Sequence, residues 1–154
     1  MKVGDMMKNQ NKLDSFLSSK KTELREAYRV TREHVLWKEY TGYDKIEELT
    51  KAEKTMIGTL FEHVVKKELS ISDGNKLDCK LDDFEYDIKF TCRNTWMIPP
   101  ECFGELCLLA KGNNNSVMVG TLIASEENLT TIPNRDGKRS ISAAGREKIK
   151  WIVK

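Results

Sequence analysis

The stretch Phe84–Thr91, which reads Phe-Glu-Tyr-Asp-Ile-Lys-Phe-Thr, has the clearest strand pattern in the sequence. Apolar and polar residues alternate along it, and because successive side chains of a strand point to opposite faces, the pattern predicts one buried and one polar face. Asp87 and Lys89 share the polar face, about 6 to 7 Å apart along the strand. The stretch therefore predicts a half-buried strand that presents a carboxylate beside an ammonium group.

The residues before this stretch are predicted to form a hairpin with it. Apolar and polar residues also alternate over Leu77–Leu81, and Asp82-Asp83 reverses the chain. The partner strand then lies alongside, so Asp78 can project toward the same rim as Asp87 and Lys89. Three charged groups are therefore expected to converge.

Helical periodicity precedes the hairpin. From residue 13 to about residue 37, apolar residues recur at roughly helical spacing, which predicts one long or broken amphipathic helix. A second helix runs from a capping-box sequence, Thr50-Lys-Ala-Glu53, to about residue 69. Glu62 lies near the edge of its broad apolar face, where a buried acid is unfavourable without a partner.

The second half of the chain returns to strand patterns. Strands are predicted at Glu105–Lys111 and Val117–Ala124, an Asp-Gly turn within Asn134–Gly137, and a closing helix over Ala143–Val153. This order predicts an α/β (α+β) fold with a central mixed sheet flanked by helices.

The size of the chain predicts one domain. Its 154 residues, 39% of them hydrophobic, are enough for one core, with residues 1–50 as an N-terminal helical part and residues 51–154 as the catalytic core. No apolar stretch has the length of a membrane span and no signal peptide is recognisable, so we expect a cytoplasmic protein with no membrane partner. The four cysteines contain no Cys-x-x-Cys pair, so we expect reduced, mostly buried thiols.

The charges are unevenly distributed, although the net charge is only +2. The segment 62–87 holds eight acidic residues against four lysines, and the segment 134–150 holds six basic residues against two acidic ones. An acidic segment can bind a cation and a basic segment can bind phosphate. A nuclease needs both, although charge runs are commonly just solvated surfaces.

The charged residues of the hairpin suit phosphodiester hydrolysis. That reaction needs a hard cation, which neutralises developing charge and activates the attacking water. Carboxylates suit Mg²⁺, because it prefers oxygen ligands and keeps several waters. Lys89 would contact that water or the scissile phosphate. Taken alone, however, Asp-x-Lys is a common sequence that most often marks the wet face of a hairpin.

A longer pattern is more specific. Glu62, Asp78, Asp87 and Lys89, separated by 16, 9 and 2 positions, resemble the active-site pattern of the NaeI type of restriction endonuclease, a branch of the PD-(D/E)xK nucleases. The resemblance covers about Leu60 to Trp151. Its matching words are Phe61-Glu62, Leu77-Asp78-Cys79, Asp87-Ile-Lys89-Phe-Thr91, Trp96-Met-Ile-Pro-Pro-Glu101 and Asn134-Arg-Asp-Gly-Lys-Arg-Ser-Ile-Ser142.

The resemblance implies a restriction-endonuclease-like core and a Mg²⁺-dependent cut of double-stranded DNA, with Mn²⁺ able to substitute. It implies that Glu62, Asp78 and Asp87 are catalytic acids and metal ligands, and that Lys89 is the catalytic lysine. It also implies a homodimer, since a two-fold enzyme matches two-fold DNA. We expect no nucleotide cofactor and a prokaryotic or phage-encoded source.

One departure from the family pattern bears on function. NaeI-like enzymes carry a second, winged-helix-like effector domain that binds DNA, and this sequence ends at Lys154 without it. Activation by effector DNA is therefore not expected. The departure leaves two alternatives to a restriction-type enzyme: a nicking DNA-repair endonuclease, or a DNA-binding subunit that needs a partner for cleavage.

Candidate DNA contacts lie in two segments. The basic turn within residues 134–142 can reach along phosphates or into a groove, and its candidates are Arg135, Lys138 and Arg139. Directly after the catalytic strand, Thr91, Arg93 and Asn94 are candidates for contacts to backbone or bases. The recognised DNA sequence depends on groove geometry that these residues alone do not define.

Overall fold

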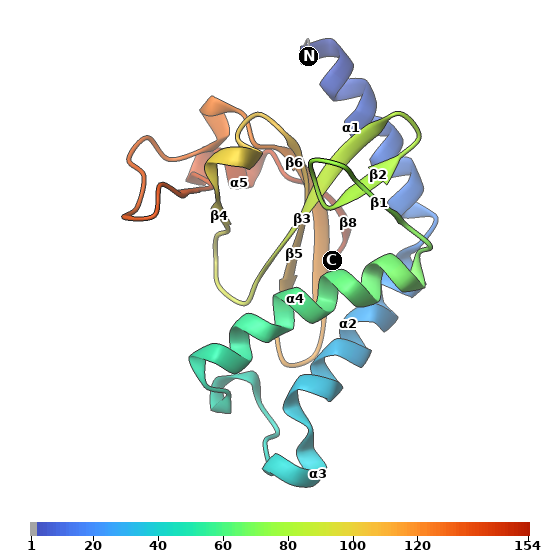
Figure 1. Cartoon of the computed structure of the whole chain (residues 1–154), viewed down its shortest axis with the longest axis vertical. Helices are drawn as coiled ribbons and strands as arrows, with labels where there is room; N and C mark the ends of the chain where they lie inside the picture. Colours follow the sequence, from blue (N-terminus) through green and yellow to red (C-terminus); the bar gives the residue numbers. More distant parts are fainter. Residues whose placement is uncertain (1–2) are drawn as a thin grey trace.

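The structure, a computed structural model, describes residues 3–154. Most of its helical residues come before its strands (Figure 1). The helices of the first half are α1 (Val3–Ser18), α2 (Lys21–Leu36), α3 (Lys38–Thr41), η1 (Ile46–Glu48) and α4 (Lys51–Glu68). Those of the second half are η2 (Pro100–Cys102), η3 (Glu126–Asn128) and α5 (Ala143–Glu147).

A mixed six-stranded sheet forms the centre of the molecule. In spatial order its strands are β1 (Ser72–Asp73), β2 (Cys79–Leu81), β3 (Phe84–Thr91), β5 (Leu106–Gly112), β6 (Val117–Ile123) and β8 (Lys150–Val153). β3 and β5 are parallel, whereas the other neighbours are antiparallel. Because parallel neighbours need a crossover, the connection between them, residues 92–105, returns to the starting end of the sheet.

Different layers cover the two faces of the sheet. Along β5, Leu106, Leu108 and Ala110 belong to the core under α1, α2 and α4, whereas Cys107 and Leu109 belong to the opposite core. Figure 1 shows the long helices along one side and the lower end of the sheet, with β4 (Met97–Ile98) and α5 on the other side. Side chains from the crossover and the C-terminal segment fill the opposite core: Trp96, Ile98, Cys102, Leu129 and Ile141.

The crossover is joined to the basic turn by a small second sheet. β4 pairs antiparallel with β7 (Arg139–Ser140), and Ile98 lies opposite Arg139. The turn itself closes through a hydrogen bond from the Asn134 N–H to the Lys138 carbonyl, and Gly137 has a φ of +82°. The predicted Asp-Gly turn is therefore confirmed, and it is attached to the segment that carries η2.

The predicted fold class is confirmed, as are the main elements around the hairpin. β2 and β3 form that hairpin, with Asp82 in the left-handed region at a φ of +53°. The capping box is also present: Thr50 Oγ1 accepts from the Glu53 N–H, and the Glu53 carboxylate accepts from the Thr50 N–H. The N-terminal helix takes its broken form, as α1 and α2.

The closing helix predicted over Ala143–Val153 is wrong. Only α5 is helical, and β8 follows it as an edge strand that pairs with residues 119–121 of β6. Trp151, Ile152 and Val153 are residue types that favour strands, and pairing with an open sheet edge outweighs the helical spacing of the segment. The pairing with β6 therefore determines that residues 150–153 form a strand.

The structure also shows the state of the four cysteines and the character of the helices. All four cysteines are free, three of them buried and Cys92 exposed. No helix within residues 3–154 is long and apolar enough to cross a membrane.

Candidate active site

Asp87 is the centre of the candidate site. It lies within β3 opposite Cys107 of β5, and only 4% of it is exposed. Its Oδ1 accepts from the Asp78 backbone N–H over 3.1 Å, and its Oδ2 accepts from Lys89 Nζ over 2.5 Å and from Cys102 Sγ over 2.8 Å. A buried carboxylate is costly unless donors satisfy it, and these three groups do so.

Asp78 directly precedes β2 and is partly buried. Its Oδ2 accepts from the Ile88 backbone N–H over 3.0 Å, while its own N–H donates to Asp87. Each acid therefore accepts a backbone hydrogen bond from the other's side of the hairpin. The structure brings Asp78, Asp87 and Lys89 together.

The two carboxyl groups have opposite pKa shifts. Burial, followed by the neighbouring Asp87, raises the pKa of Asp78 to about 7. Burial also acts to raise the pKa of Asp87, but the groups that donate hydrogen bonds to it prevail and lower it. Because two like charges this close do not both ionise readily, Asp87 carries the charge and Asp78 retains a proton up to near neutral pH.

Lys89 neutralises Asp87. Burial acts to lower the pKa of Lys89, but the hydrogen bond and the attraction to Asp87 prevail and raise it. The ammonium group therefore stays protonated at neutral pH. It can orient a phosphate or a water through its N–H groups, but it cannot take up a proton.

Glu62 lies on α4 and forms an ion pair with Lys66. Its Oε2 is 3.5 Å from Lys66 Nζ, and the same ammonium donates to Asp73 Oδ1 over 3.1 Å. Its negative charge still contributes to the raised pKa of Asp78. Glu62 therefore lies beside the Asp78–Asp87 pair, with Lys66 as its counter-ion.

The donor set suits a hard divalent cation. Within residues 3–154, no three His, Cys, Asp or Glu side chains are grouped closely enough to bind a metal ion together. Asp78 and Asp87 offer two adjacent carboxylates, and Mg²⁺ is commonly bound by one or two carboxylates with waters as its other ligands. Burial and the neighbouring acids raise the pKa of Asp78, and a bound cation would favour its ionised form.

Two residues of the site were not recognised from the sequence. Cys102 is one of the four cysteines expected only to be reduced and mostly buried, but its thiol contacts Asp87. Glu85 was placed only on the polar face of β3, but its carboxylate accepts the backbone N–H groups of residues 75–77, which lead directly into Asp78. Its polar-face position beside Asp87 was the available signal, whereas the Cys102 contact depends on the crossover.

Gly74 allows the Glu85 arrangement. An added Cβ at position 74 would lie 2.3 Å from the Leu77 carbonyl oxygen and 2.7 Å from Glu85 Oε1. Both distances are too short for a methyl group, so a side chain at position 74 would displace the loop that positions Asp78.

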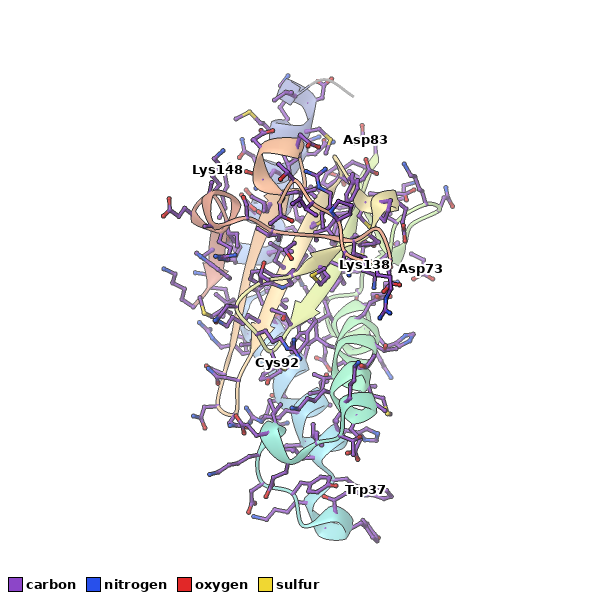
Figure 2. The ribbon with its side chains drawn as sticks, turned by 90° about the vertical axis from the view of Figure 1, so that its left-hand side faces the viewer. Trp37, Asp73, Asp83, Cys92, Lys138 and Lys148 are labelled. Atoms are coloured by element: carbon purple, nitrogen blue, oxygen red, sulfur yellow. The ribbon has the colours of Figure 1, made fainter. Side chains whose placement is uncertain are left out.

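The candidate DNA contacts are placed in two groups. Arg135 and Lys138 are exposed on the basic turn, and Figure 2 shows Lys138 on the loop that faces the viewer. An added Cβ at Gly137 would lie 3.5 Å from Pro100 Cγ, so the turn lies against η2. The basic turn is thereby adjacent to the helix that carries Cys102.

Arg139 forms its contacts inside the fold, unlike the exposed Arg135 and Lys138 of the same turn. It is only 9% exposed, and its guanidinium forms two hydrogen bonds of 2.8 Å to the Glu126 carboxylate. It also donates to the Thr130 carbonyl and lies over the Phe103 ring. The Arg139 side chain therefore anchors the turn and does not point into solvent.

The second group of candidates follows β3. Thr91 Oγ1 accepts from the Arg93 N–H over 3.0 Å, which turns the chain as the strand ends. Asn94 Oδ1 accepts from Lys111 Nζ, and Arg93 is exposed. Figure 2 shows Cys92 just beyond the end of β3, between these residues.

The family to which this mixed sheet and its acidic hairpin belong is identified by comparison with known protein families. Residues 17–154 match the family model described as restriction endonuclease NaeI. Since this match covers most of the chain, the chain belongs to that family.

A curated relative agrees with the family match. The type II restriction enzyme NaeI of Lentzea aerocolonigenes is 31% identical to this chain over 111 residues. The match covers 71% of this chain and 35% of the relative. The chain therefore corresponds to about a third of the length of that relative.

Proposed function

We propose that this chain is a Mg²⁺-dependent endonuclease that hydrolyses phosphodiester bonds of double-stranded DNA at a specific sequence. The observation that carries the proposal is the contact of Asp78, Asp87 and Lys89 in a chain of the NaeI restriction endonuclease family. Mn²⁺ should substitute for Mg²⁺, because carboxylate and water oxygens suit both ions.

The acids would hold the cation. Asp78 and Asp87 offer adjacent carboxylates. Lys66 pairs with both Glu62 and Asp73, so Glu62 can supply a third carboxylate if its own ion pair with Lys66 breaks. When bound, the cation supplies positive charge to the reacting phosphate and lowers the pKa of the attacking water.

Lys89 would act directly on the reacting groups. Because it stays protonated, it can donate to the scissile phosphate or orient the attacking water. Its side chain is 24% exposed, so its charge is only partly screened by solvent. Stabilisation of developing negative charge by such a group is a large contribution in phosphoryl chemistry.

The DNA would lie against the basic turn and the end of β3. Arg135 and Lys138 would contact phosphates, while Thr91, Arg93 and Asn94 would contact the backbone or base edges. Arg139 would support this surface by holding the turn through Glu126. We also propose a homodimer, because a double-strand cut in a palindrome needs two active sites related by a two-fold axis.

Cleavage of supercoiled plasmid and phage DNA in Mg²⁺ tests the proposal. The natural chain should give discrete fragments, and Asp87→Ala and Lys89→Ala should abolish them. Lys80→Ala, at an exposed lysine of the neighbouring strand, is the matched control and should cleave normally. Cleavage that is indifferent to the Asp87 and Lys89 substitutions would refute the assigned site.

The products distinguish the two alternatives. Persistent open circles indicate nicking of one strand, whereas linear DNA indicates paired cuts. Binding without cleavage indicates a DNA-binding subunit that needs a partner for cleavage.

A further inference from the structure

Cys102 is a buried thiol in direct contact with Asp87. It is 2% exposed, and its Sγ lies 2.8 Å from Asp87 Oδ2, the oxygen that also accepts from Lys89. A protonated thiol has one hydrogen to donate, and a carboxylate can only accept. The contact is therefore a hydrogen bond from the thiol to the carboxylate.

The backbone around Cys102 fixes the direction of this thiol. Its N–H donates to the Pro99 carbonyl over 2.9 Å, and Pro100 opens the short helix η2, where its ring restricts the backbone. The buried neighbours Trp96 and Ile98 belong to the same hydrophobic core as Cys102. The thiol is thus held by the crossover, a segment separate from the hairpin that carries both acids.

We propose that Cys102 is a positioning residue that fixes the orientation of the Asp87 carboxylate for cation binding. This inference rests on the proposed function. The Asp78 N–H fixes Oδ1, and Cys102 fixes Oδ2 from the opposite core, so rotation of the carboxylate would break a hydrogen bond at each oxygen. Lys89 alone does not provide this restraint, because its long, flexible side chain can move with the Asp87 carboxylate when that group rotates.

Three variants test this role. Cys102→Ala removes the donor, Cys102→Ser keeps a hydroxyl donor, and Cys107→Ala removes a buried thiol of the same core that has no hydrogen bond to Asp87. Because a thiol is a weak donor, its hydrogen bond to the carboxylate predicts that Cys102→Ala loses about 2- to 10-fold in cleavage rate. It should also need more Mg²⁺ for half-maximal rate, whereas Cys102→Ser should restore most of the loss.

Two further readouts do not depend on cleavage. Mn²⁺ binding, measured by electron paramagnetic resonance, should weaken in Cys102→Ala and remain normal in Cys107→Ala. The infrared S–H stretching band that disappears in Cys102→Ser should lie at a lower wavenumber than an unbonded thiol, and Asp87→Asn should shift it. These measurements remain decisive if the natural chain cleaves no DNA, so failure of this inference is distinguishable from failure of the proposed function.

Equal losses in Cys102→Ala and Cys107→Ala would overturn the inference, because they would indicate a general packing effect. Failure of Cys102→Ser to restore function, or an S–H band unaffected by Asp87→Asn, would also overturn it.

Discussion

The backbone N–H of Asp78 donates to Asp87 Oδ1 over 3.1 Å, so two acids nine positions apart meet across the β2–β3 hairpin. This contact joins the two sides of the hairpin at the point where the two carboxyl groups lie close together. The pair is stable without a cation because Asp78 retains its proton up to near neutral pH, as its raised pKa shows.

The first prediction concerns Asp78→Asn. The folded-state pKa of Asp78 is raised from 3.8 to about 7, so its favourable contribution is present at low pH and is lost as pH rises through that range. Asn cannot ionise, but it keeps an acceptor for the Ile88 N–H. Without divalent cations, the variant should therefore become more stable than the natural chain as pH rises from 4 to 8.

Urea denaturation in EDTA measures this effect. The gain at pH 8 should be on the order of 1 to 2 kcal/mol, because one pKa unit corresponds to about 1.4 kcal/mol and solvent screening at this partly exposed group reduces the effect. Added Mg²⁺ should reduce the gain, because only the natural chain offers two carboxylates. Stability curves that run parallel from pH 4 to 8 would contradict the assignment.

The second prediction concerns Lys66→Met. Its ammonium pairs with Glu62 and therefore competes with a cation for that carboxylate. Removal of one positive charge near the site should lower the Mg²⁺ concentration for half-maximal cleavage by roughly 2- to 10-fold. Lys67→Met, at an exposed neighbour on α4, is the control and should leave the Mg²⁺ dependence unchanged. An increased Mg²⁺ requirement in Lys66→Met would indicate instead that Lys66 holds Glu62 in place.

The third prediction separates the residues of the basic turn. Arg135→Ala and Lys138→Ala should weaken DNA binding without loss of stability, and each should reduce the salt dependence of the binding constant by about one unit of slope. Arg139→Ala should instead lower the melting temperature, because it breaks the Glu126 ion pair that anchors the turn. Titration of binding against salt and thermal unfolding measure the two effects. A normal melting temperature in Arg139→Ala would contradict the anchoring role.

The fourth prediction concerns Glu85→Ala. Backbone N–H groups of Leu77, Asn75 and Lys76 lower the pKa of Glu85, so its stabilising effect is present above its usual pKa of 4.5 and is lost as pH falls through the lowered value. The variant should be less stable than the natural chain at pH 7, and the difference should shrink in strong acid. Denaturation at both pH values measures this. Glu68→Ala, at an exposed acid on α4, is the control and should be as stable as the natural chain at pH 7.

Local patterns were sufficient to predict the hairpin and its charged face. Alternation along Phe84–Thr91 placed Asp87 and Lys89 on one side, and the Asp82-Asp83 turn brought Asp78 beside them. The capping box at Thr50 predicted where α4 begins. These features depend on residues close in sequence, so the sequence carries enough information for them.

Contacts between distant segments could not be predicted in this way. The Cys102–Asp87 contact depends on the parallel pairing of β3 with β5, which no local pattern reveals. The Glu126–Arg139 pair likewise depends on how the turn folds back. β8 was mistaken for helix because its pairing with β6 is a tertiary feature.

The interior position of β3 has a consequence for how the protein loses function on heating. Residues 84–86 of β3 pair with β2, and residues 87–91, which include Asp87 and Lys89, pair with the central strand β5. The amide hydrogens of this part of β3 should therefore exchange with solvent only when a large unit of the sheet opens. Asp87 and Lys89 therefore lie in a part of the chain that frays late. Inactivation should coincide with cooperative unfolding of the sheet and not precede it.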